Sequence, residues 1–102
     1  MGVGLQIVCL GFAGAARIEA EAGAQLVRLE RFSRYLRDCH LEVEMLSSTA
    51  GLEYDARLDL VTRPGDLVPI THCLSTDPEA AVRAAFEAAE RELQQQASLD
   101  GD

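Results

Sequence analysis

The chain has 102 residues, of which 48% are hydrophobic, and this length is enough for one globular domain but too short for two. Its net charge is −8, because 17 acidic side chains outweigh 9 arginines and there is no lysine, so general attraction to nucleic-acid phosphates is disfavoured. Three widely spaced cysteines without a CxxC pair argue against a disulfide framework and favour reduced thiols in the cytoplasm. No apolar run approaches the roughly 20 residues that a membrane-spanning helix needs, and the apolar N-terminal segment lacks the basic start of a secretory signal.

The first predicted element is a β-strand over residues 5–10, a short apolar run that ends at Gly11. A long amphipathic helix is predicted to follow, from Ala15 or Ala16 to about Arg37. Apolar side chains recur along one stripe of this helix every three or four residues, so the stripe is expected to pack against a sheet. The stripe comprises Ile18, Ala22, Leu26, Leu29, Phe32 and Leu36.

The same helix is predicted to carry the main basic surface of the chain. Arg28, Arg31, Arg34 and Arg37 recur at every third position and should therefore fan over its solvated side. The segment from Arg28 to Arg37 has a charge of +3 in a chain of −8, which leaves −11 on the remainder. Any binding of a polyanion is expected to depend on this helix. The alternative is a solvated face without a partner, in which Arg34 pairs with Glu30 one turn earlier.

Two strands are predicted to follow the helix. Residues 39–45 alternate strictly between apolar and polar side chains, as does the longer segment 52–62, and this period indicates half-buried strands. Residues 46–51 between them are rich in Ser, Thr and Gly and are predicted to form the loop of a hairpin. The outward side chains should form a wet, acidic sheet face. They are His40, Glu42, Glu44, Glu53, Asp55, Arg57 and Asp59.

A turn and a last strand are expected next. Residues 63–66, Arg-Pro-Gly-Asp, have Pro and Gly at the positions that a type II turn prefers. The chain should reverse there into a fourth strand over residues 67–74. Pro69 removes a ladder donor from that strand, which predicts that it lies at an edge of the sheet.

The second predicted helix has two alternative start signals. Thr76 and Glu79 can form a capping box, or Asp77 can cap the helix with Pro78 as its first residue. The apolar period continues to about Gln95, where the helix is expected to end.

The element order βαβββα predicts an α/β (α+β) fold with a four-stranded mixed sheet and both helices packed on one face. The first strand should return through the helix to lie parallel beside the second, and the others should pair antiparallel. Residues 1–96 are expected to form a single domain, and residues 97–102 a frayed tail. The predicted core comprises Leu5, Ile7, Leu26, Leu29, Phe32, Leu36, Leu41, Val43, Tyr54, Leu58, Leu60, Val82, Phe86 and Leu93.

Few residues of the sequence are candidates for metal binding or catalysis. Cys39-His40 and His72-Cys73 have the side chains of a zinc site, but neighbours on a strand point to opposite faces, so no metal site is expected. The acidic side chains of the middle strands sit on a flat face without a nucleophile, and no nucleotide fingerprint is present. The sequence therefore predicts a protein that is not an enzyme, with no catalytic residues, no cofactor and no small-molecule substrate.

Two long runs of sequence resemble a known family. The first, LVRLERFSRYLRDCHLEVEML, contains the helix motif LERF; the second, YDARLDLVTRPGDLVPITHCLSTDPEAAVRAAFEAAEREL, contains the turn, the edge strand and an Asp-initiated helix ending in EREL. From about residue 5 to 95, this pattern is similar to the ribosome hibernation-promoting factors, also called ribosome-associated translation inhibitors. None of these motifs is an active-site fingerprint, so they indicate fold more firmly than activity.

The resemblance implies a cytoplasmic stress-response factor that binds the decoding region of the small ribosomal subunit and blocks messenger and transfer RNA. Members of the family fold as βαβββα and contact ribosomal RNA with basic residues on the two helices. The implied rRNA-binding residues of this chain are Arg28, Arg31, Arg34 and Arg37 on the first helix and, more weakly, Arg83 and Arg91 on the second.

The chain departs from the family pattern in its second helix. That helix usually ends in several lysines or arginines, whereas here Glu92 and the glutamines at 94–96 occupy its end. An aromatic residue is often found in its first turn, where this chain has Glu79 or Ala80. The chain also resembles the short forms of the family, which lack the further domain that pairs ribosomes.

These departures support an alternative of a different class. A divergent member could keep the fold, lose most of its affinity for RNA and act as a protein-binding or self-associating module, since a charge of −11 outside the first helix would repel RNA. The uncharged first strand at residues 5–10 would then offer an unguarded edge for a homodimer.

Overall fold

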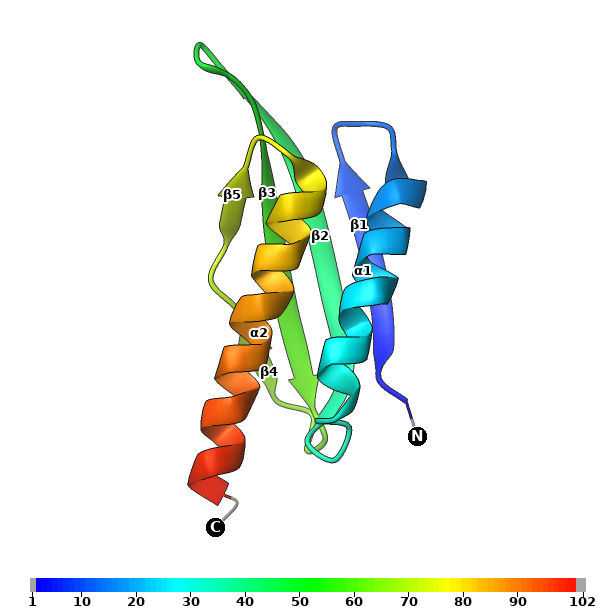
Figure 1. Ribbon diagram of the computed structural model, residues 1–102, viewed down its shortest axis with the longest axis vertical. Helices are drawn as coiled ribbons and strands as arrows, with labels where there is room; N and C mark the ends of the chain where they lie inside the picture. The colour runs from blue at the N-terminus through cyan, green and yellow to red at the C-terminus, as the bar shows by residue number, and fades with distance from the viewer. Residues whose placement is uncertain (1, 101–102) are drawn as a thin grey trace.

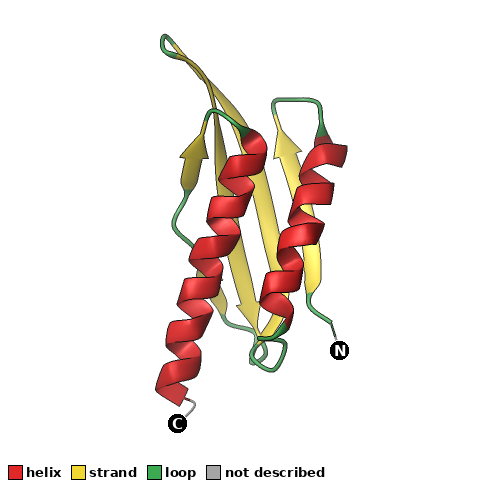
Figure 2. Ribbon diagram, in the orientation of Figure 1, coloured by secondary structure: helices red, strands yellow, loops and turns green. Residues whose placement is uncertain are grey.

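The computed structural model describes residues 2–100 of the chain, with side chains through Ser98. Five strands form one sheet, and two helices lie side by side on one of its faces (Figures 1 and 2). The elements are β1 (Gly4–Leu10), α1 (Ala15–Glu30), β2 (Leu36–Ser48), β3 (Gly51–Thr62), β4 (Leu67–Pro69), β5 (Cys73–Ser75) and α2 (Pro78–Asp100). Neither helix, within the described part of the chain, has the length and apolar character needed to cross a membrane.

The sheet has the predicted mixed topology. β1 pairs parallel with β2, β2 pairs antiparallel with β3, and both β4 and β5 pair antiparallel with β3. The α+β fold with both helices on one face is therefore confirmed. The predicted fourth strand, however, is divided into β4 and β5. Between them the buried Ile70 still donates its N–H to the carbonyl of Leu58, but residues 70–72 lie opposite only residues 57–58 of β3, so one extra residue interrupts the regular ladder before β5.

The alternation predicted for the middle strands is also confirmed. Cys39, Leu41 and Val43 on β2 face the helices and are at most 1% exposed. His40 and Glu44, from the intervening positions, are exposed on the other side. Because the side-chain period of a strand is two, this register fixes one dry face and one wet face for the whole sheet.

The first helix is shorter than predicted, because α1 ends at Glu30 and the next five residues form turns. Phe32 and Ser33 donate their N–H groups to the carbonyls of Leu29 and Glu30, three residues earlier, which tightens the end of the helix. Leu36 is still fully buried, but as the first residue of β2. The spacing of Leu29, Phe32 and Leu36 thus fits a helix and a helix–turn–strand equally well, and the prediction of a helix to Arg37 is wrong.

The loop predicted for residues 46–51 is also wrong, because β2 and β3 continue through it to a two-residue tip at Thr49 and Ala50. Ser48 builds this tip. Its hydroxyl accepts from the N–H of Ala50 at 3.2 Å and donates to the carbonyl of Gly51 at 3.3 Å. The hairpin extends beyond the ends of both helices (Figure 1), so its polar residues can be paired and solvated at the same time.

The second helix starts as one of the two alternatives predicted. Asp77 accepts a hydrogen bond from the N–H of Ala80 at 3.1 Å, and Pro78 is the first helical residue. α2 then continues to Asp100, so the frayed tail predicted from residue 97 is helical over residues 97–100. Residues 101–102 lie outside the described part.

The core lies between the helices and the sheet. Ten of the predicted core residues are buried, whereas Leu5, Ile7, Leu26 and Tyr54 are half-buried and pack against its margin. The predicted core list omitted Ala22, Ala85 and Ala89, although their spacing puts them on the apolar stripes of the two helices; they are completely buried and let the helices approach the sheet closely.

Candidate nucleic-acid interface

α1 and α2 run in the same direction, and charged side chains link them in a fixed register (Figure 1). Arg17 pairs with Glu79, Glu21 with Arg83, and Arg28 with Glu90, and each pair is separated by 62 residues in the sequence. The Arg83 Nη1–Glu21 Oε1 distance is 3.1 Å and the Arg28 Nη1–Glu90 Oε1 distance is 3.5 Å. We call this set of pairs the interhelical ladder.

Two of the predicted RNA-binding arginines lie at the lower end of this ladder. Arg28 also approaches Glu87, with 3.6 Å between Nη1 and Oε2, and Arg31 Nη2 lies 2.9 Å from the second carboxylate oxygen of Glu90. Exposed pairs of this kind contribute only about 0–1 kcal/mol to stability. The pairs also place two α2 carboxylates, Glu87 and Glu90, against the guanidinium groups that were predicted to contact phosphate, which neutralises their charge.

Of the other predicted arginines, Arg83 belongs to the ladder through Glu21, whereas Arg34, Arg37 and Arg91 do not. Arg34 lies exposed in the turn after α1, and Arg91 lies exposed on α2; no carboxylate among the described residues is within ion-pair distance of either. Arg37 belongs to β2, where its Nε lies 3.1 Å from Asp38. The prediction of four arginines fanned over one helix is therefore wrong, since only Arg28 is within α1.

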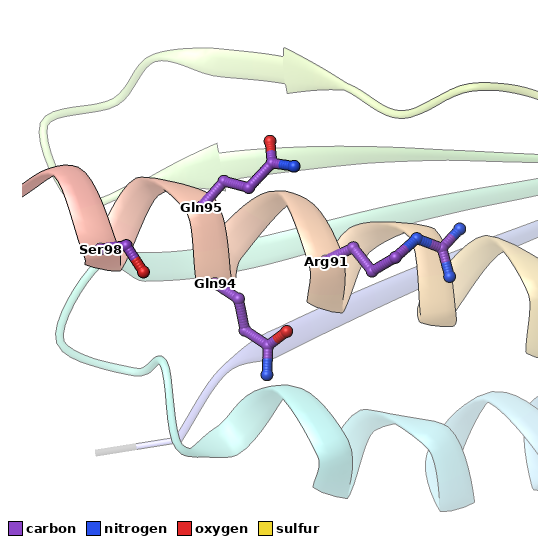
Figure 3. Close-up of a pocket in the computed structure, with 4 residues that line it drawn as sticks. All are labelled: Arg91, Gln94, Gln95 and Ser98. Carbon is purple, nitrogen blue, oxygen red and sulfur yellow. The ribbon is translucent and has the colours of Figure 1, made fainter.

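The helix layer as a whole is not basic. α1 contains two arginines and three glutamates, and α2 contains two arginines and five acidic residues, so the two helices carry −1 and −3. Figure 3 shows α2 near its C-terminal end, where Arg91 is followed by the neutral side chains of Gln94, Gln95 and Ser98. This surface offers hydrogen bonds to a partner but little attraction for phosphate.

The open sheet face is acidic, as predicted. It carries five carboxylates and one arginine, and Arg57 lies 3.6 Å from Asp59 of the same strand. His72 adds a further contact to this surface, with Nδ1 at 2.9 Å from Asp55. Neither arrangement leaves a free cation there, so RNA would be repelled from this face.

A cleft of about 510 Å³ lies between the turn after α1, the β3–β4 turn and the C-terminal half of α2. Arg34 and Tyr35 line it from the first turn, and Arg63 from the second. Arg63 also ties the two turns together, because its Nε donates to the carbonyl of Ser33 at 2.9 Å and its N–H donates to that of Tyr35 at 2.7 Å. Sequence analysis missed Arg63 and Tyr35 as site residues, since nothing local indicates that residues about thirty apart meet. The only signal was that Arg63 opens the predicted turn.

The cysteines do not form a reactive or metal-binding site. Burial raises the pKa of the Cys39 thiol to about 12, and the nearby carboxylates of Asp38 and Glu30 act in the same direction. Burial also raises the pKa of Cys9 and of Cys73. Protonated thiols are poor ligands and nucleophiles. Among the side chains of residues 2–98, no group of three or more His, Cys, Asp or Glu could hold a metal ion.

Comparison with known proteins gives matches among solved structures alone, because no family model and no curated protein matches the chain. A ribosomal subunit interface protein from Coxiella burnetii superposes with a TM-score of 0.78, at 14% identity, over 94% of this chain and 99% of the other. The N-terminal domain of Protein Y from Thermus thermophilus superposes with a TM-score of 0.68, at 17% identity, over 92% of this chain and 99% of that domain. The chain has their fold. This is the fold that the family resemblance implied, and at these identities the likeness extends to the fold alone.

Proposed function

We propose that the protein is a ribosome-associated translation inhibitor of the cytoplasm, which binds the small subunit and its rRNA and silences translation under stress. The observation that supports this most strongly is the shared fold. A ribosomal subunit interface protein matches nearly the whole chain, over nearly all of its own length. A second protein of the same fold, the Protein Y domain, matches over a similar range.

The charge distribution favours contact through one end of the molecule. Arg34 is exposed and has no carboxylate partner among the described residues, and Arg63 lines the adjoining cleft. Three other arginines already pair with a carboxylate of the neighbouring helix: Arg28, Arg31 and Arg83. Each would have to give up this ion pair to bind a phosphate, which reduces the binding free energy of each phosphate contact. We therefore place the primary rRNA contact at the turn after α1, with Arg91 as a secondary contact on α2.

Co-sedimentation with ribosomes tests this proposal. The protein should migrate with the small subunit in a low-salt sucrose gradient of a stationary-phase lysate, and Arg34→Glu together with Arg91→Glu should reduce the bound fraction at least about tenfold. Reversal of two phosphate contacts removes attraction and adds repulsion, and it should flatten the dependence of binding on salt. The control is Arg57→Glu, which changes charge in the same direction on the open sheet face. A protein that stays at the top of the gradient at low salt contradicts the proposal.

Self-association is the second candidate function, and the edge of β1 favours it. β1 pairs only with β2, and its sequence, GLQIVCL, has no charged residue. Its three side chains on the helix side are only half-buried, whereas their partners on β2 are almost fully buried, so the margin of the core is incompletely covered. The half-buried side chains are Leu5, Ile7 and Cys9. On the open face Val8 is 51% and Leu10 is 40% exposed. A second copy paired antiparallel along β1 would satisfy the free backbone groups and cover these side chains.

Salt should strengthen this association, in contrast to RNA binding. Glu19 lies close enough to raise the pKa of Cys9, and the Glu30 carboxylate lies beside Gly2, so both glutamates flank the β1 edge. Antiparallel pairing would bring Glu19 of one copy toward Glu30 of the other, and their repulsion is screened by salt.

Val8→Lys is the test of the β1 dimer. A lysine at an edge opposes pairing between sheets, and at this position it faces Glu42 across the parallel ladder, so the monomer fold should tolerate it. Sedimentation equilibrium should show a dimer that tightens with salt for the native protein, and a monomer for Val8→Lys. The matched control is Val27→Lys on the outer side of α1, where the side chain is 71% exposed. A monomer at all salt concentrations excludes this candidate function.

A further inference from the structure

The cleft at the end of the molecule has the chemistry of a small-ligand site. Its volume, about 510 Å³, is within the range of about 300–1,000 Å³ typical of such sites. Half-buried Val68 from β4 supplies aliphatic surface, whereas Leu60 and Leu93 behind the cleft are 0% and 3% exposed and belong to the core. Tyr35 adds an aromatic ring. A flat apolar group could therefore leave water and lie against this surface.

The cleft is held in shape by hydrogen bonds that do not depend on a ligand. Arg63 ties the β3–β4 turn to the turn after α1 through two bonds, of 2.9 and 2.7 Å. Thr62 closes the β3–β4 turn, since its carbonyl accepts from Gly65 at 2.8 Å and its N–H donates to the carbonyl of Asp66 at 2.9 Å. Binding would consequently require little ordering of the backbone, which lowers its entropic cost.

Charged groups of both signs line the cleft. Arg34 and Arg63 enter from the two turns, and guanidinium groups bind phosphate in a bidentate manner. Glu92 and Gln96 lie on the α2 wall, where Glu92 Oε2 accepts from Gln96 Nε2 at 3.3 Å. Asp66 supplies a second carboxylate. A simple polyanion would be repelled by these carboxylates, so the lining selects a ligand that combines an anionic group with hydrogen-bond donors.

We infer that this cleft binds a single nucleotide. The phosphate lies against Arg34 and Arg63, the base lies against Tyr35 and the aliphatic surface, and the exocyclic amino group of the base donates to Glu92 or Asp66. Aromatic and arginine side chains together are the usual platform for unpaired bases. The nucleotide can come from the free pool or from an unpaired position in RNA. The inference does not require that the protein bind the ribosome.

Titration followed by backbone amide NMR tests the inference. AMP, GMP and CMP should each shift the amides of Ser33, Tyr35 and Arg63 at sub-millimolar concentration. UMP, which lacks an amino group, should bind several-fold more weakly. Ribose 5-phosphate and adenosine each lack one half of the ligand and should bind at least about tenfold more weakly than AMP, because the phosphate and base contacts add. Ribose 5-phosphate that binds as tightly as AMP overturns the inference, since the site would then be an anion site alone.

Two variants and an RNA arm complete the experiment. Arg34→Gln, at an exposed position, should weaken AMP binding about tenfold, whereas Arg57→Gln on the open face should leave it unchanged. Equal weakening by both variants overturns the inference. A pentameric single-stranded RNA that shifts the same amides far more tightly than AMP identifies RNA as the source, and equal affinities identify the free nucleotide. Absence of shifts with AMP and with the RNA overturns the site, while ribosome co-sedimentation measured on the same protein reports separately on the proposed function.

Discussion

Replacing Glu87 and Glu90 with glutamine should raise the affinity of the protein for single-stranded RNA by about tenfold at low salt. Both carboxylates contact Arg28, and Glu90 also contacts Arg31, so their removal frees two guanidinium groups at the lower end of the interhelical ladder. Each new phosphate contact should steepen the dependence of log affinity on log salt by about 0.7 for a single strand. Fluorescence anisotropy across a salt series measures the affinity and the slope together.

A matched control separates this local release from a general change of charge. Glu44 and Glu53 lie exposed on the open sheet face, and within the described residues neither has an ion-pair partner. Replacing both with glutamine also adds two units to the net charge. The affinity and the salt slope should change little in this variant. If they rise as much as in the Glu87/Glu90 variant, the ladder does not mask the arginines and the effect is long-range electrostatics.

Phe86→Ala should lower the free energy of unfolding by about 3–5 kcal/mol, the usual cost of truncating a fully buried aromatic side chain. Phe86 is 0% exposed and lies in the middle of α2, between the helix and the sheet. Small domains have a total stability of only about 5–15 kcal/mol, so this loss removes a large share of the free energy of unfolding. Urea denaturation followed by circular dichroism measures the change.

Val27→Ala provides the comparison, because that side chain is on the solvent side of α1. Its substitution should change the stability by less than about 0.5 kcal/mol. A loss at Phe86 no greater than the loss at Val27 would mean that α2 does not pack on the sheet as described.

The middle strands show what sequence can predict in this fold. Val43 and Glu44 point to opposite faces because alternation is a local property of one strand with one wet side. The cap of α2 was equally local, since Asp77 and Pro78 adjoin the helix that they start. The end of α1 was not predictable in this way, because Leu36 is buried whether the chain continues as a helix or turns into a strand.

The contacts of the candidate site join residues that are far apart in the sequence, so they could not be predicted from the sequence. Arg28 was expected to be solvated or to contact phosphate, and its pairing with Glu90 needs the register between two helices. Arg63 was predicted only to be part of a turn. Its contact with Ser33 requires the whole sheet to bring the two turns together.

The interhelical ladder also constrains how related chains can differ. A change at position 28 alters the environment of position 90, and the same holds for positions 17 with 79 and 21 with 83, since each pair shares one ion-pair contact. Exchange of the two signs within a pair preserves the attraction, whereas a single reversal places like charges side by side. Substitutions at these positions should therefore occur jointly, at a constant interval of 62 residues. In a homologue whose second helix is basic, we expect either fewer arginines on the first helix or a polyanion bound to the surface that the two helices share.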